Sequence, residues 1–202
     1  MAISLLRCIC GAQHSLSKDR GAPAPSPPLG RRSKYSGQSV RAMPMRLLTV
    51  GKKRSRGTQL LVEEYKEKLG YYCDFEDTLI RSNPKLTSDV KVQVEAEDMA
   101  MIQQLKSDDF VVVLDENGKD VISEQIADLI GDAGNTGSSR LTFCIGGPYG
   151  LGVQVRKRAD ATIRLSSLVL NHQVALVVLM EQLYRQDENL LGDLLVATCF
   201  KL

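Results

Sequence analysis

The sequence of 202 residues lacks the features of several common protein classes. Its five cysteines include no Cys-x-x-Cys pair and its two histidines are far apart, which argues against a zinc site. An odd number of cysteines without framework spacing also argues against a secreted disulfide scaffold. No apolar run reaches about 18 residues, the length that spans a bilayer. We therefore expect a soluble protein with reduced thiols, no metal and no membrane segment.

Strong charge of either sign is also lacking. The 26 basic and 24 acidic residues leave a formal net charge of +2, which is too mild to indicate a nucleic-acid-binding protein by itself. The basic residues are unevenly spread, because seven of them precede Met43 and only Asp19 opposes them. These seven are Arg7, Lys18, Arg20, Arg31, Arg32, Lys34 and Arg41.

Residues 1–44 form a leader that is rich in Ser, Pro, Gly and Arg. Such a segment cannot bury enough apolar surface to fold. A basic, acid-poor leader is typical of plastid or mitochondrial transit peptides, whereas a secretory signal would show a longer apolar block. We therefore expect a disordered transit peptide and an organelle location, a plastid rather than a mitochondrion. A plain disordered tail is the alternative.

From Met45 onward, short apolar segments alternate with amphipathic ones. Strands are predicted at residues 45–50, 71–76, 110–114, 140–145 and 161–165, and helices at 58–69, 89–106, 124–130, before 158 and after 171. This alternation predicts an α/β fold with a parallel sheet covered on both faces. The turn sequence of residues 115–118 should end the third strand. Ser123 is the expected N-cap of the following helix, and Gly131 should close it.

Ligands of open α/β sheets bind beyond the C-terminal ends of the strands. Three segments follow predicted strands in this way: residues 114–115, the glycine loop 146–152 and residues 165–170. The glycine loop has neither GxGxxG nor the Walker Gly-Lys-Ser/Thr, and no acid stands about 20 residues on to hold a ribose. This disfavours a nucleotide-binding regulator. Glycines still let the backbone approach a ligand, although a structural turn is the alternative. For Asp115, closing a turn is the simpler interpretation.

The last predicted helix starts after Asn171, whose side chain can cap it. Residues 174–180 are almost uniformly apolar, so this helix should be buried on most of its circumference. His172 stands at its start, where a lone histidine is usually structural. No Ser-His-Asp arrangement, carboxylate pair or metal cluster can be assembled from spacing, and we assign no catalytic residue.

Five segments of this region resemble the RlmH family in order and spacing. They are MRLLTVGK (45–52), FVVVLDENGK (110–119) with the following Ser123-Glu124, FCIGGPYGL (143–151), LSSLVLNHQ (165–173) and LMEQLYR (179–185). The resemblance covers residues 45–185. It identifies the chain as a plant-type, organelle-targeted homologue of a family in the SPOUT superfamily of methyltransferases.

The resemblance implies a parallel-sheet α/β SPOUT methyltransferase fold with a C-terminal trefoil knot, in a homodimer. It implies S-adenosylmethionine as the cofactor. The implied substrate is nitrogen-3 of a pseudouridine in large-subunit ribosomal RNA, within the assembled ribosome of an organelle. Carried over by motif, eight residues would line the cofactor pocket: Leu114, Gly146, Leu165, Ser166, Ser167, Leu168, Val169 and Leu170.

The resemblance stops at Arg185, and residues 186–202 form a divergent tail. Family members continue into a short helix that ends near Tyr-His and a basic residue, whereas QDENLLGDLLVATCFKL follows here. Removing the imide proton of pseudouridine requires a base with a pKa near neutrality, a role that suits histidine. His172 corresponds to the internal histidine of the family, not to the terminal one. We expect cofactor binding and dimerisation to survive and methyl transfer to be weak or lost.

Two functions of different classes therefore remain open. One is a methyltransferase acting on organelle ribosomal RNA, and the other is a catalytically silent, knotted RNA-binding or ribosome-assembly protein. In both, basic residues are expected to meet RNA phosphates without reading sequence, with ordinary solvated charges as the alternative. These basic residues are Lys52, Lys53, Arg54, Arg56, Arg156, Lys157 and Arg158.

Overall fold

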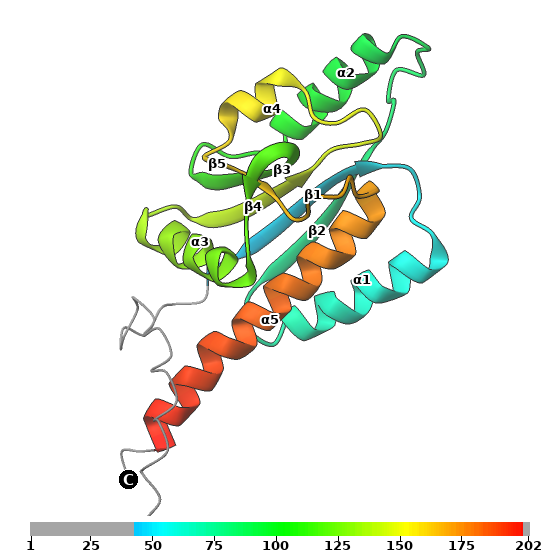
Figure 1. Ribbon diagram of the computed structural model, residues 1–202. Helices are drawn as coiled ribbons and strands as arrows, with labels where there is room; N and C mark the ends of the chain where they lie inside the picture. Colours follow the sequence, from blue (N-terminus) through cyan, green and yellow to red (C-terminus); the bar gives the residue numbers. More distant parts are fainter. Residues whose placement is uncertain (1–42, 200–202) are drawn as a thin grey trace, which may run out of the picture. The chain divides into compact units, whose positions relative to one another are not determined.

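The computed structural model describes residues 43–199, with side chains for residues 43–185. The expected transit peptide therefore lies outside the described residues except for its last two positions. Strands and helices alternate along the chain (Figure 1) in the order β1 (Met45–Gly51), α1 (Arg56–Leu69), β2 (Phe75–Arg81), α2 (Val90–Ile102), β3 (Asp109–Asp120), α3 (Ser123–Asn135), β4 (Arg140–Ile145), α4 (Val153–Arg158), β5 (Ala161–Arg164) and α5 (His172–Cys199).

The five strands form one sheet in the order β2-β1-β4-β3-β5. Every pairing is parallel, and Met45 of β1 lies opposite Phe75 of β2 and Leu141 of β4. The parallel, helix-covered α/β sheet predicted from the sequence is confirmed. The C-terminal ends of the strands consequently lie along one edge of the sheet, where ligand-binding loops are expected.

Helices cover both faces of the sheet, as Figure 1 shows. On one face, α1, α3 and α5 pack on strand residues such as Leu47 and Phe143, both fully buried. On the other face, α2 and α4 pack on Leu48 and Val113. Because successive strand residues point to opposite faces, buried residues alternate between the two cores. Burying a side chain of this size stabilises the fold by about 1.5–3 kcal/mol.

Several predicted element boundaries are wrong. Strand β2 begins at Phe75 instead of residue 71, since Tyr71 is exposed. Strand β3 runs through the predicted turn to Asp120, with a register shift between Leu114 and Lys119 opposite Ile163.

Both predicted ends of helix α3 also differ from the structure. Its N-cap is Ile122, whose N–H donates to the Gln125 side chain, while Ser123 lies in the first turn. Gly131 lies inside the helix, which continues to Asn135 because Ala133 is buried in the core.

The last helix begins as predicted and runs further. Asn171 Oδ1 accepts from the N–H of Gln173, which is the expected cap. Leu176, Leu179 and Met180 are buried, but Val174 is 51% exposed. The remaining residues of 174–180 are half-buried, so most of the circumference of this part of α5 is at least partly covered in the single chain. Its backbone continues through the divergent tail to Cys199, while the side chains beyond Arg185 lie outside the described residues.

Candidate functional site

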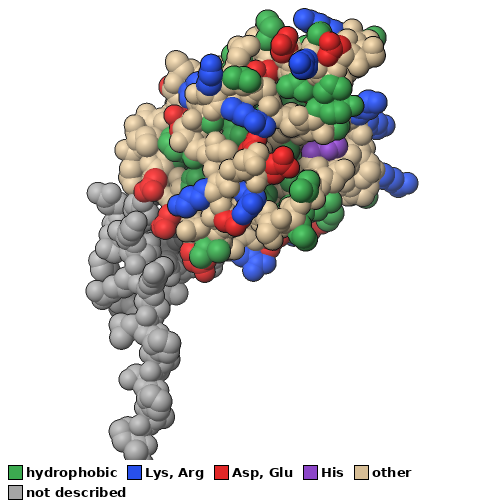
Figure 2. Space-filling view, turned by 45° about the horizontal axis from the view of Figure 1, so that its top comes forward, with side chains coloured by type: hydrophobic (Ala, Val, Ile, Leu, Met, Phe, Trp, Pro, Cys, Tyr) green, Lys and Arg blue, Asp and Glu red, His purple; other side chains and the backbone are tan. Residues whose placement is uncertain are grey.

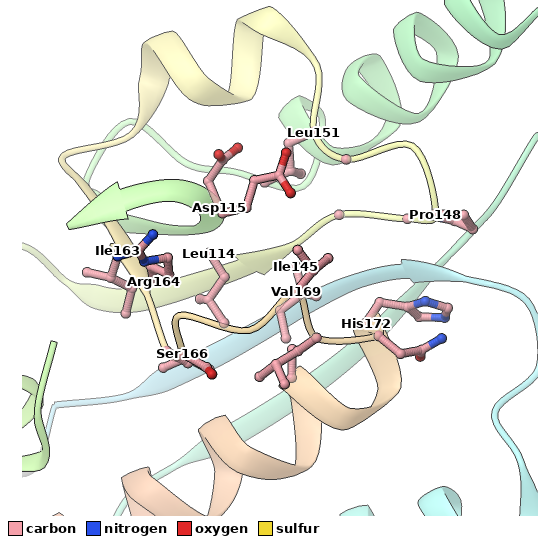
Figure 3. A pocket seen from close by; sticks show the side chains of 18 of the residues that line it. Leu114, Asp115, Ile145, Pro148, Leu151, Ile163, Arg164, Ser166, Val169 and His172 are labelled. Atoms are coloured by element: carbon pink, nitrogen blue, oxygen red, sulfur yellow. The ribbon is translucent and has the colours of Figure 1, made fainter. Parts of the chain in front are cut away.

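A cavity of about 640 Å³ lies at the C-terminal edge of the sheet (Figure 3). This volume is within the range of small-molecule sites. The three segments singled out from the sequence converge on it: the end of β3, the glycine loop after β4, and residues 165–170 between β5 and α5. Apolar side chains such as Leu114, Ile145 and Ile163 form much of its lining.

Seven of the eight predicted cofactor-binding residues line this cavity. They are Leu114, Gly146, Leu165, Ser166, Leu168, Val169 and Leu170. Ser167 is the exception, since it does not belong to the lining and its side chain is exposed. The spatial grouping is therefore as predicted for seven positions, and their contact with a cofactor stays a prediction.

The glycine loop folds tightly back on itself. A Cβ at Gly146 would lie 2.7 Å from the Gly150 carbonyl carbon, and Gly150 has φ of +81°. The N–H of Gly150 donates to the Gly147 carbonyl oxygen across the loop. Larger residues are excluded at Gly146 by contact and are strained at Gly150 by conformation. This loop therefore brings main-chain atoms directly to the cavity wall.

Two buried acids of α2 support the loop from behind. Both oxygens of the Asp98 carboxylate accept from backbone N–H groups of Gln154 and Val155, at 2.8 and 2.9 Å, at the start of α4. Glu97 accepts from Ser82, Asn83 and Gln93 through Oε1. These bonds hold α2, the β2–α2 loop and the glycine loop together. The sequence analysis did not single out either acid, because most of their hydrogen-bond partners lie far away in the sequence and no motif connects them.

Residues 165–170 cross the open side of the cavity. Ser166 Oγ accepts from the Leu168 N–H, which fixes a local turn. The side chains of Leu168 and Val169 line the cavity and yet are 73% and 83% exposed. Apolar side chains that line a cavity and face solvent are typical of a surface that binds a ligand or a second chain.

Charged side chains also line the cavity. Arg156 of α4 pairs with Asp115 at 2.7 Å, and Arg164 of β5 pairs with Asp120 at the end of β3. The hydrogen bond from Arg164 holds the pKa of Asp120 below its usual value. Asp115 closes a local turn, as the simpler sequence interpretation predicted, because its Oδ1 accepts from the Asn117 N–H. Its carboxylate also lies in the cavity wall.

His172 lines the cavity at the start of α5, and Figure 3 shows its ring near the end of β1. Burial lowers its pKa below the ordinary value. A Cβ at Gly51 would lie 3.6 Å from the His172 Nε2, so the ring packs against the end of β1. The next residue, Gln173, accepts from the Ser55 N–H and from Thr58 Oγ1. The loop after β1 is therefore tied to the cavity.

The predicted RNA-contacting residues divide into two groups. The exposed group consists of Lys52, Lys53, Arg56, Arg156 and Lys157, and basic side chains lie near the histidine in Figure 2. Arg54 is only 7% exposed and forms a bidentate pair with Asp77.

Arg158 also has structural partners. It donates to Asp160 and to the carbonyl oxygens of Lys106, Ser107 and Asp109. The donors of Arg54 and Arg158 therefore hold the fold together, which disfavours these two residues as phosphate contacts.

Two further searches cover only the part of the chain that the structure describes. Within it, no helix is long and apolar enough to cross a membrane. Within residues 43–185, no group of three or more His, Cys, Asp or Glu side chains could hold a metal ion.

Comparison with known proteins identifies the class. The family described as "Predicted SPOUT methyltransferase" matches residues 43–189. One relative is a protein of Arabidopsis thaliana that is named as a candidate RNA methyltransferase. It is 60% identical to this chain over 194 residues, which are 96% of this chain and 98% of the relative.

Two bacterial relatives have more specific names. Ribosomal RNA large subunit methyltransferase H of Christiangramia forsetii is 38% identical over 144 residues, 71% of this chain and 92% of that protein. The protein of the same name from Clostridium botulinum strain Loch Maree is 31% identical over 156 residues, 75% of this chain and 98% of that protein. A crystal structure of the SpoU methyltransferase AviRb from Streptomyces viridochromogenes, in complex with AdoMet, aligns with a TM-score of 0.40 and 17% identity, over 72% of this chain and 58% of that one.

The chain belongs to the SPOUT methyltransferase family. The family, the enzyme class and the α/β fold expected from the resemblance are confirmed. SPOUT methyltransferases use S-adenosylmethionine, and the cavity suits such a group, with main-chain atoms at Gly146 and apolar side chains for an adenine face. The trefoil knot stays a prediction.

Proposed function

We propose that this chain is an S-adenosylmethionine-dependent methyltransferase that acts on nitrogen-3 of a pseudouridine in the large-subunit ribosomal RNA of an organelle ribosome. The observation that carries this proposal is the convergence of the glycine loop, Leu114 and residues 165–170 on one cavity. The bacterial relatives, named as ribosomal RNA large subunit methyltransferases, support ribosomal RNA as the substrate.

The chemistry requires positioning above all. When bound, S-adenosylmethionine supplies an electrophilic methyl group for an in-line displacement, whose rate depends strongly on orientation. The rigid glycine loop and residues 165–170 would bind and orient the cofactor. The exposed lysines at positions 52 and 53 follow β1 at the same edge of the sheet and would hold RNA phosphates beside the cavity. No residue is assigned as the base.

A homodimer is part of the proposal. Leu168, Val169 and Val174 are 73%, 83% and 51% exposed, and all three belong to the cavity rim or the start of α5. Three large apolar side chains exposed so close together favour a second chain as their cover. This arrangement would also shield the apolar side of the cofactor site from water.

The location is proposed from the leader. Residues 1–42 are basic and acid-poor, which favours an organelle. Of the two organelles, we propose a plastid. The Arabidopsis relative aligns over 96% of this chain, so most of the leader has a counterpart there. Expression of the full chain fused to a fluorescent protein would locate it, and a cytosolic signal would overturn this part of the proposal.

The second candidate is a catalytically silent, knotted RNA-binding or ribosome-assembly protein. It is favoured by one specific observation, the sequence after Arg185, which lacks the Tyr-His ending expected from the RlmH resemblance. In this protein the cofactor cavity and the dimer would persist while methyl transfer would be absent.

The test is methyl transfer from labelled S-adenosylmethionine to ribosomes that lack the modification. This chain is compared with a variant whose residues after Arg185 are replaced by a tail ending in Tyr-His, and cofactor affinity is measured for both. Methyl transfer by both chains supports the enzyme and shows that catalysis does not need the Tyr-His ending. Transfer by the replaced chain alone supports the silent protein. Cofactor binding without transfer by either chain excludes the enzyme, and absence of cofactor binding excludes both functions.

A further inference from the structure

One ion pair in the cavity wall connects β3 to α4. Arg156 Nη2 lies 2.7 Å from Asp115 Oδ2. The Asp115 side chain is only 7% exposed, and its Oδ1 accepts from the Asn117 N–H at 2.9 Å, so the carboxylate is fixed in place. The Arg156 side chain is 47% exposed, and a Cβ at Gly150 would lie 3.6 Å from its Nη2. The guanidinium therefore lies over the glycine loop, at the cavity.

This pair keeps unused hydrogen-bonding capacity on both partners. A guanidinium carries several N–H donors and a carboxylate several lone pairs, and the ion pair engages one nitrogen of Arg156. Arg164, the other arginine of the cavity, differs because its Nε and Nη2 both donate to the Asp120 carboxylate. Of the two cavity arginines, Arg156 therefore has more donors left for a ligand.

The two charges match one chemical group. An α-amino acid carries a carboxylate and an ammonium on the same carbon, and it is bound best by a guanidinium beside a carboxylate. Arg156 and Asp115 present this pair at one end of the cavity, where main-chain and apolar groups form the rest of the lining. The cavity therefore has a charged end and an apolar end.

We propose that Arg156 and Asp115 form the subsite for the α-amino-acid end of S-adenosylmethionine, an inference that rests on the proposed function. Arg156 donates to the cofactor carboxylate and Asp115 accepts from its ammonium. The adenosine part lies against residues 165–170. The pair thereby discriminates the complete cofactor from adenosine derivatives without the amino acid.

The test compares two thioethers by calorimetry. S-adenosylhomocysteine has the complete amino acid, and 5′-propylthio-5′-deoxyadenosine lacks only its ammonium and carboxylate. Charge-assisted hydrogen bonds predict that the unmodified chain binds the first ligand about tenfold to a hundredfold more tightly. In Arg156→Gln and in Asp115→Asn, this ratio should fall to within about threefold of unity.

The affinity of each variant for the propyl compound should stay unchanged, which shows that the adenosine site is folded. The matched control is Lys157→Gln, which removes the same charge from the next position of α4 outside the cavity lining, and it should keep the full ratio.

The possible failures are distinct. If the unmodified chain binds neither thioether, the proposed function and this inference both fail. If it binds both and Arg156→Gln keeps the ratio, or weakens the two ligands equally, the amino-acid subsite is wrong while the cofactor cavity stands. A ratio that falls equally in Lys157→Gln also overturns the subsite, because a general charge effect then accounts for it.

Discussion

At the scale of single residues, His172 gives a prediction about pH. Burial lowers its pKa in the folded chain, while the unfolded chain titrates near the ordinary 6.5. The unfolded state therefore binds the proton more readily. The stability linked to the neutral ring is fully present above pH 6.5 and is lost as the pH falls through the lower folded pKa. In an NMR titration, the His172 ring should titrate below pH 6.5.

The variant His172→Gln serves as the control for this titration. It removes one of two histidine signals and so assigns the other to His14. Its unfolding free energy should decrease less than that of the unmodified chain between pH 7 and pH 5.5. A His172 signal that titrates at or above 6.5 would contradict the prediction.

The same scale shows what sequence motifs could and could not predict. Seven of the eight predicted pocket residues line the cavity because contiguous motif residues sit on loops that the parallel sheet brings to one edge. Ser167 does not belong to the cavity lining, and its contact with a cofactor stays a prediction. The Asp115–Arg156 pair was missed because it joins two segments 41 positions apart, and no local pattern links them.

At the scale of elements, Gln173 connects the start of α5 to the loop before α1. Its Oε1 accepts from Ser55 N at 3.2 Å and from Thr58 Oγ1 at 3.0 Å. In Gln173→Leu these bonds are lost, at a cost of about 0.5–1.5 kcal/mol each. Backbone hydrogen exchange near Ser55 should accelerate, and the KM for ribosomes should increase severalfold while kcat stays unchanged.

The matched control for this change is Gln59→Leu. It removes the hydrogen bond from Gln59 to Glu63, which lies within α1. Exchange at Ser55 and the KM should then stay as they are. If both variants raise the KM equally, the connection to α5 has no special role in placing the loop.

Element boundaries were predictable where local pattern and tertiary packing agree. Strand β4 has the predicted bounds of residues 140–145, because its apolar run is buried on both faces. Strand β3 does not stop at the Asp-Glu-Asn-Gly sequence. Its extension pairs with β5, and a Cβ at Gly118 would lie 2.5 Å from the Ile163 carbonyl carbon. Residues 115–118 themselves have no partner in this pairing, and Asp115 Oδ1 accepts from the Asn117 N–H, so the turn forms as an irregularity within the strand instead of at its end.

At the scale of the whole molecule, a weak net charge is compatible with RNA binding if exposed basic side chains are clustered on the surface that meets the RNA. Lys52 and Lys53 are exposed beside the cavity edge, while Arg54 and Arg158 are used by the fold. Replacing both lysines by glutamine should therefore weaken ribosome binding. Each lost phosphate contact reduces the slope of log affinity against log salt by about 0.7–0.9.

The comparison variant carries Lys66→Gln and Lys106→Gln. These exposed lysines precede β2 and β3, at the opposite edge of the sheet. The charge change is the same in both double variants, so a nonspecific effect of net charge would flatten both salt slopes alike. A slope reduced only by the changes at positions 52 and 53 places the RNA at the C-terminal edge. An unchanged slope in the variant at positions 52 and 53 would show that these two lysines do not contact RNA phosphates, which contradicts the proposed binding of RNA beside the cavity.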